Sequence, residues 1–217
     1  MSEADDVLGA SLPVLDALEA RVLGVLVEKA AATPEVYPLT LNAVQLGCNQ
    51  KTNREPVMHA ELGEVGHALR TLEEKKLVRA SYGARVQRYE HTFDAALNLT
   101  PRSRAVMALL LLRGPQTQGE LFVRSQRLAD FPDGEILGDT LERLIAREPP
   151  LVVRLGRASG QREDRYMHLL SGPVSADSYA VSAPADAAIS ASGDLVARVE
   201  ELERIVADLQ RRLGGDS

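Results

Sequence analysis

The chain repeats one succession of helical and strand-like segments, and this repeat constrains its fold more than any other feature. Each copy contains three segments with apolar residues at helical spacing, followed by two short stretches typical of strands. The expected segments are 15–31, 41–47, 61–76, 77–82 and 85–93 in the first copy, and 102–114, 118–128, 134–147, 150–155 and 165–170 in the second. Such a repeat indicates duplication of one small unit.

Three helices followed by a hairpin is the order of elements in a winged helix, where a short helix leads into the helix that enters the DNA major groove. We therefore predict a mainly α fold with small β wings (α+β), made of two tandem winged-helix domains and a C-terminal heptad helix. The predicted domains are 12–97 and 98–172, after an acidic N-terminal tail at 1–11. An unrelated α+β domain with similar patterning is the alternative.

Helix-capping residues support these boundaries. Residues of preferred N-cap types precede four of the predicted helices: Thr40, Thr100, Thr117 and Asp133. Their side-chain oxygens can accept hydrogen bonds from the free N–H groups of the first turn. Glu120 follows Thr117 at the spacing of a capping box. In the short second helix, Leu41, Val44 and Leu46 are expected to face the core.

The C-terminal residues change in character. Residues 173–193 are small and polar, with Pro and Gly, which predicts a flexible linker. We then predict a coiled-coil helix at 194–213 that pairs two chains as a homodimer. Its apolar residues follow heptad spacing: Leu195, Val199, Leu202, Val206, Leu209 and Leu213. Because this seam spans barely three heptads, an amphipathic helix that folds back on its own chain is the alternative.

Composition argues against several classes of protein. Apolar residues make up 45% of the 217 residues, enough for a buried core, but aromatic residues make up only 4%, so an RNA-binding surface of stacked rings is not expected.

The best apolar run, 106–112, is far shorter than the roughly 20 residues that span a bilayer, so we expect no membrane association. The acidic N-terminus does not resemble a signal peptide, and the single Cys48 permits no internal disulfide. We expect a cytoplasmic protein.

The net charge of −6 is unevenly distributed. Residues 1–11 include three acidic and no basic residues, and residues 173–217 include eight acidic and four basic ones. Between them, residues 12–97 have ten basic and eleven acidic residues, and residues 98–172 have eleven basic and nine acidic ones. A near-neutral body can still carry a local basic stripe, so the charge does not exclude a nucleic-acid partner.

A polar string between the second and third predicted helices is the first candidate site. It lies near the helix-turn-helix corner, and its members are Asn49, Gln50, Lys51, Thr52, Asn53 and Arg54. The cations can meet phosphates, and the amides and the hydroxyl can donate to phosphates or to base edges. In the alternative interpretation these side chains close the loop themselves, with Arg54 paired to Glu55 or Glu28.

The predicted wings are rich in arginine, a residue suited to phosphate or minor-groove contact. The candidates are Arg79, Arg85 and Arg88 in the first wing, and Arg157, Arg162 and Arg165, with Arg154, in the second. Glu163 and Asp164 interrupt the second set, so a solvated hairpin is the alternative there.

The third helix argues against simple base reading. Its acidic residues outnumber its central bases: Glu61, Glu64, Glu73 and Glu74. Only His67, Arg70 and Thr71 offer plausible groove contacts, and carboxylates near phosphate repel it. This acidic helix favours a second hypothesis, a protein-interaction adaptor.

The sequence offers little for catalysis. It contains no nucleophile elbow, P-loop or dinucleotide fingerprint. Cys48 is interpreted as a small core residue. The four histidines lack the spacing of zinc ligands and are expected to be ordinary surface or wing residues: His59, His67, His91 and His168. We therefore expect a non-enzymatic protein with no cofactor and no metal.

The stretch TPEVYPLTLNAVQLGCNQKTNREPV, residues 33–57, resembles the signature of the YceH family, conserved bacterial proteins of unknown function. The segments EVGHALRTLEEKKLV, RVQRYEHTF and LLLRGPQTQGEL extend the resemblance over residues 15–172. The resemblance implies a tandem winged-helix fold and no established activity. The chain departs from the family pattern at Ala60 and Glu61, where Leu and a capping Ser are expected, and in the glycines at 63 and 66.

Two functional hypotheses follow. The first is a DNA-binding regulatory or chromosome-associated factor that contacts the phosphate backbone of double-stranded DNA through the 49–54 corner and the wing arginines. The second is an adaptor whose winged helices grip a partner protein.

Overall fold

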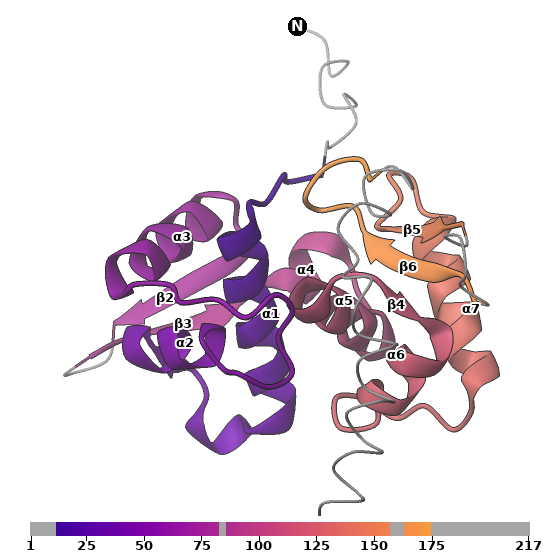
Figure 1. Ribbon diagram of the computed structural model, residues 1–217. Coiled ribbons are helices and arrows are strands. Elements are labelled where there is room, and N and C mark those ends of the chain that lie inside the picture. The colour runs from indigo at the N-terminus through magenta and orange to yellow at the C-terminus, as the bar shows by residue number, and fades with distance from the viewer. Residues whose placement is uncertain (1–11, 83–85, 157–162, 175–217) are drawn as a thin grey trace, which may run out of the picture. The chain divides into compact units, whose positions relative to one another are not determined.

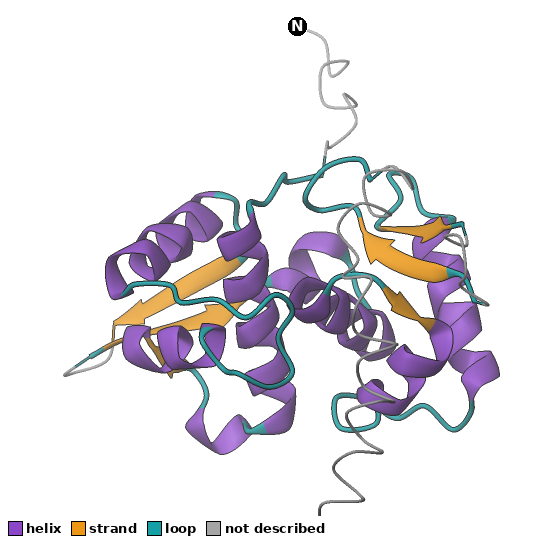
Figure 2. Cartoon of the chain, in the orientation of Figure 1, coloured by secondary structure: helices purple, strands orange, loops and turns teal. Residues whose placement is uncertain are grey.

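The computed structural model describes residues 12–82, 86–156 and 163–174. All of them belong to one compact unit, which lies within Met1–Ala176. These residues form seven α-helices and two three-stranded antiparallel sheets, so the fold is mixed α+β and mainly helical (Figure 2). The acidic tail, the heptad segment, and Arg85, Arg157 and Arg162 lie outside the described residues. No helix in the described ranges is long and apolar enough to cross a membrane.

The first half, residues 12–97, contains every element predicted for the first copy (Figure 1). Its elements are α1 (Ala17–Ala32), the 3-10 helix η1 (Pro34–Val36), β1 (Leu39–Thr40), α2 (Leu41–Cys48), α3 (Leu62–Glu74), β2 (Val78–Tyr82), β3 (Gln87–His91) and α4 (Phe93–Leu97). The sheet order is β1-β3-β2, with Leu39 opposite Tyr89.

The second half has the same order of main elements. They are α5 (Pro101–Arg113), β4 (Gln116–Thr117), α6 (Gln118–Ser125), α7 (Gly134–Ile145), β5 (Val152–Leu155) and β6 (Arg165–His168). Its sheet order is β4-β6-β5, with Gln116 opposite Tyr166. The two halves therefore share sheet topology as well as element order. The sequence did not predict β1 and β4, because a two-residue strand is too short to show periodicity.

The predicted caps are present. The hydroxyl oxygens of Thr40, Thr100 and Thr117 and a carboxylate oxygen of Asp133 each accept a hydrogen bond from the backbone of the following first turn. The capping box of Thr117 is complete, because Glu120 accepts a hydrogen bond from its backbone N–H at 2.9 Å. These local contacts set where four helices begin.

The first helices of the two halves pack against each other, which gives the halves a common core. Residues 19–28 of α1 and 105–112 of α5 are buried on every side. Gly24 allows the close approach, since a Cβ at this position would lie 2.9 Å from Cγ of Leu112. The long apolar run at 106–112 is explained by this central position.

One expectation about burial was wrong. Leu46 was expected to face the core, but it is 71% exposed, because α2 packs on α1 through Gly47 and its neighbours instead. His91 and His168 were expected to be surface or wing residues, and they lie in the hairpin strands β3 and β6. Both are buried there, because His168 is only 3% exposed and the His91 side chain is 9% exposed.

Candidate functional site

The loop that joins α2 to α3, residues 49–61, is called the corner loop here. Two buried arginines hold it to the body of the protein. Arg21 of α1 donates to the carbonyl oxygens of Cys48 at 3.1 Å and Pro56 at 2.7 Å. Arg54 donates through Nε to the carbonyl oxygen of Gly47 at 2.9 Å.

The carboxylate of Glu28 completes this anchorage. Arg54 Nη2 lies 2.5 Å from Glu28 Oε2, and the two side chains are 0% and 3% exposed. The alternative prediction, in which Arg54 pairs with Glu28, therefore describes the structure. With its guanidinium buried and held by protein oxygens, Arg54 does not present a surface for phosphate, and we remove it from the candidate contacts.

Asn49 also has a structural role. Its Nδ2 donates to the carbonyl oxygen of Ala60 at 2.9 Å, and its Oδ1 accepts from the Ala60 N–H at 2.8 Å. Helix α3 then begins without the capping Ser, because Glu64 accepts a hydrogen bond from the Glu61 N–H at 2.7 Å. The glycines at 63 and 66 do not prevent this helix from starting at Leu62.

The outer part of the corner loop remains at the surface. Lys51, Thr52 and Asn53 are exposed. Asn53 has a φ of 61°, a left-handed conformation that Asn tolerates better than most residues. Its Oδ1 accepts a hydrogen bond from Arg113 at the end of α5. The N–H of Glu55 donates to the carbonyl oxygen of Leu112 at 2.9 Å, so the corner loop rests on the second half.

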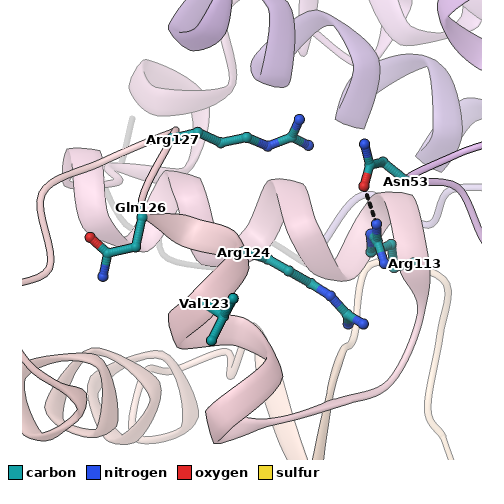
Figure 3. Close-up of a pocket in the computed structure, with 6 residues that line it drawn as sticks. All are labelled: Asn53, Arg113, Val123, Arg124, Gln126 and Arg127. Carbon is teal, nitrogen blue, oxygen red and sulfur yellow. Dashed lines mark hydrogen bonds between the residues drawn. The ribbon is translucent and has the colours of Figure 1, made fainter.

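Next to Asn53 lies a hollow of about 280 Å³, called the arginine hollow here. It is lined by Asn53, Arg113, Val123, Arg124, Gln126 and Arg127. Figure 3 shows the guanidinium groups of Arg113, Arg124 and Arg127 extending toward the side of the hollow where Asn53 lies, while Gln126 turns away. Three cations, from α5, from α6 and from the turn after α6, therefore share one space with a polar group from the corner loop.

Each arginine of the hollow has a protein partner that fixes its direction. Arg113 donates to Asn53, and Arg127 pairs with Glu28. Arg124 donates to Gln116 Oε1 at 2.8 Å and lies 3.3 Å from Glu120. Guanidinium groups held in this way are positioned for a ligand before it binds, which lowers the entropy cost of binding.

Within the described ranges, the lining of the arginine hollow includes the three cations Arg113, Arg124 and Arg127 and no carboxylate. Arg124 pairs with Glu120 and Arg127 pairs with Glu28. Burial, followed by the neighbouring charges of Arg124 and Arg127, lowers the pKa of Arg113. Burial, followed by the charge of Arg54, lowers the pKa of Arg21. The site therefore favours an anion.

The other predicted arginines that the structure describes do not line the arginine hollow. Arg79 lies 2.6 Å from Glu90 and keeps 69% of its side chain exposed, and Arg88 donates to the carbonyl oxygen of Pro38 at 2.7 Å. Arg165 is held between Glu120 and the carbonyl oxygen of Pro115. Arg70 is exposed on α3.

Sequence reasoning missed Arg113, Arg124 and Arg127, which belong to the second half. One signal was present, since Arg124 and Arg127 are three residues apart and so can share a helix face. These residues meet Asn53 only because the two halves pack against each other, and no pattern of neighbouring residues in the sequence predicts that packing.

Cys48 has no features of a reactive thiol. It is 0% exposed, and burial raises its pKa to about 12, so the thiol stays protonated and fills space in the core. Among the residues that the structure describes, no group of three or more His, Cys, Asp or Glu side chains could hold a metal ion.

Comparisons with known proteins place the chain in a family. The family model described as "Protein of unknown function, DUF480" matches residues 15–161. A UPF0502 protein of Xanthomonas campestris pv. campestris (strain B100) is 55% identical over 205 residues, which cover 93% of this chain and 91% of the relative. A UPF0502 protein of Mesorhizobium japonicum is 52% identical over 206 residues, 95% of this chain and 98% of the relative. The chain belongs to this bacterial family, as its resemblance to bacterial proteins of unknown function led us to expect.

Proposed function

We propose that this member of the DUF480 family is a non-enzymatic protein of two winged-helix domains that binds duplex DNA through the phosphate backbone, as a regulatory or chromosome-associated factor. The resemblance to the YceH family and the topology common to both halves support the winged-helix assignment. In this assignment α2, the corner loop and α3 form the helix-turn-helix of the first domain.

One observation carries the proposal: the exposed outer part of the corner loop meets the arginines of the second half through Asn53. Lys51 and Thr52 are exposed next to Asn53, and Asn53 lines the arginine hollow with Arg113, Arg124 and Arg127. Phosphate oxygens of DNA accept hydrogen bonds from such Lys, Arg, Thr and Asn side chains. Because Arg54 is buried, only the outer part of the corner expected from the sequence, Lys51, Thr52 and Asn53, belongs to this candidate surface.

The mode of binding is backbone contact with little base reading. Four exposed carboxylates lie on or next to α3, those of Glu61, Glu64, Glu73 and Glu74. Carboxylates pushed into a groove would meet phosphate repulsion. Affinity therefore comes from the corner loop and the arginines, and it depends steeply on salt.

The test is fluorescence anisotropy of a labelled mixed-sequence duplex of about 30 base pairs over a range of salt concentrations. If Lys51, Arg113, Arg124 and Arg127 each neutralise one phosphate, the logarithm of the binding constant falls with the logarithm of salt with a slope of about −3 to −4. Arg113→Gln, whose partner in the structure is Asn53, reduces the slope by about one. The charge-conserving Arg113→Lys is the matched control and keeps the slope.

Two results would count against this function. One is absence of binding at low salt, where even weak phosphate contacts are detectable. The other is a slope unchanged in both Lys51→Ala and Arg113→Gln, since these variants remove one cation from the corner loop and one from the arginine hollow. Thermal unfolding of each variant establishes that the fold is intact.

An adaptor that binds a partner protein is the second candidate, and the surface of α2 and α3 favours it. Leu46 and Leu62 are 71% and 41% exposed, and four exposed glutamates lie on or next to α3. Apolar side chains bordered by acids suit a basic, amphipathic partner segment. Capture of one stoichiometric protein that survives nuclease and high salt, and that is lost in Leu46→Glu, would support this function over DNA binding.

A further inference from the structure

We propose that the arginine hollow is a discrete seat for one phosphoryl group, which takes small phosphate-bearing ligands such as inorganic pyrophosphate or a nucleotide as well as the DNA backbone. The proposal shares its arginines with the proposed function but does not depend on DNA binding. It adds a ligand class and a form of regulation, because a small ligand in the seat displaces duplex.

The donors of the seat come from three places in the chain. Arg113 ends α5, Arg124 lies in α6, and Arg127 follows α6 by two residues. Asn53 contributes from the corner loop of the other half. Since Asn53 Oδ1 already accepts from Arg113, the Nδ2 group remains as the donor of this amide (Figure 3). Three guanidinium groups and an amide N–H match the several terminal oxygens of a phosphoryl group.

The charges at the seat favour binding of an anion. Arg124 and Arg127 each share a glutamate with another arginine: Glu120 also contacts Arg165, and Glu28 also contacts Arg54. Arg113 interacts with the neutral amide of Asn53. A dianion placed among these groups gains attraction from all three guanidiniums, at a site where partial burial weakens screening by solvent.

The size of the hollow narrows the choice of ligand. Its volume of about 280 Å³ is just below the range usual for small-molecule sites, roughly 300–1,000 Å³. A volume of this size has room for a phosphoryl or pyrophosphoryl group. Val123, which is 72% exposed, and Gln126 lie at its edge, where the rest of a nucleotide can extend into solvent.

Calorimetric titration of the full-length protein with inorganic pyrophosphate, at constant ionic strength, tests the seat directly. We expect saturable binding in the wild type, weakened about tenfold or more in Arg113→Gln, because a charge-assisted hydrogen bond is lost. Asn53→Gly, which suits the positive φ, should weaken binding less. Arg79→Gln is the matched control, since Arg79 is an exposed arginine that does not line the hollow.

Arg113→Lys separates a built seat from general electrostatic attraction. Lysine keeps the charge but not the planar fork of donors, so pyrophosphate binding weakens while the salt slope of duplex binding stays. In competition experiments, pyrophosphate displaces duplex from the wild type more than an equal ionic strength of chloride does.

The outcomes distinguish the seat from the proposed function. Pyrophosphate binding that is lost in Arg113→Gln, without duplex binding, supports the seat and refutes the DNA function. No pyrophosphate heat at millimolar concentration, or equal heat in the wild type and Arg113→Gln, overturns the seat even if duplex still binds.

Discussion

Stability should depend strongly on the buried carboxylate of Glu28. Glu28 lies at the middle of an arrangement with Arg54 on one side and Arg127 on the other. Replacing it with Gln keeps the size and nearly the helix propensity of the residue but removes the negative charge. Arg54, whose side chain is 0% exposed, is then left as a buried cation without its carboxylate.

The expected loss in the free energy of unfolding follows from the burial of Arg54. Breaking a buried ion pair by removing one partner costs about 3–5 kcal/mol, because the remaining charge stays desolvated. Arg127→Gln is the matched control. It breaks the other ion pair of Glu28, but Arg127 is 45% exposed, and a pair that is open to solvent is worth about 1 kcal/mol or less.

Urea unfolding followed by circular dichroism measures both variants, and the difference in midpoint gives the change in the free energy of unfolding. A double replacement, Glu28→Leu with Arg54→Met, should recover most of the loss, since an apolar pair removes both desolvated charges. A loss below about 1 kcal/mol in Glu28→Gln, or equal losses in Glu28→Gln and Arg127→Gln, would refute the claim that burial of the Arg54 pair makes Glu28 critical.

Three further predictions concern the core. Burial lowers the pKa of His168 from 6.5 to about 4. The unfolded state therefore binds more protons between these pH values, and the free energy of unfolding should fall by up to about 3 kcal/mol as the pH falls from about 6.5 to about 4. In His168→Gln the urea midpoint should change less with pH across this window. A Cβ at Gly47 would lie 2.5 Å from Cγ1 of Val25, so Gly47→Ala should lower the thermal midpoint through overpacking of about 1–3 kcal/mol, and an unchanged midpoint would contradict the packing. Because Cys48 is buried with a pKa near 12, a thiol reagent at neutral pH should label it only after unfolding; rapid labelling of the native protein would contradict this.

Local chemistry made most of the helices predictable. Thr117 and Glu120 form the capping box that their spacing indicated, and the caps at Thr40, Thr100 and Asp133 are equally present. Capping contacts join residues only three or four positions apart, so they can be predicted directly from the sequence. The repeat of three helices and a hairpin was visible for the same reason, because each element has its own periodicity.

The features that the sequence did not reveal depend on contact between distant segments. The burial of Glu28 results from the packing of α1 against α5 and from Arg127, which is 99 residues away. Arg54 looked like a phosphate ligand because its pairing with Glu28 was only one of several possibilities. Leu46 was misplaced because α2 has only eight residues, and the face that packs on α1 is set by Gly47 rather than by apolar spacing.

In the candidate site, too, local features were predictable and contacts between distant segments were not. The exposed side chains of Lys51, Thr52 and Asn53 were predicted from their polar character and loop position. Arg113 and Arg124 become part of the site only when the corner loop rests on the end of α5. Even the alternative that Arg54 has a structural role did not indicate that its neighbour Asn53 would reach the second half.

The measurement that tests the central claim most directly is the salt dependence of duplex binding in the wild type and in Arg113→Gln, measured by fluorescence anisotropy. The account predicts binding that weakens linearly in the logarithm of salt, with a slope shallower by about one in Arg113→Gln and preserved in Arg113→Lys. Absence of binding at low salt, or identical slopes in the wild type and Arg113→Gln, would contradict it.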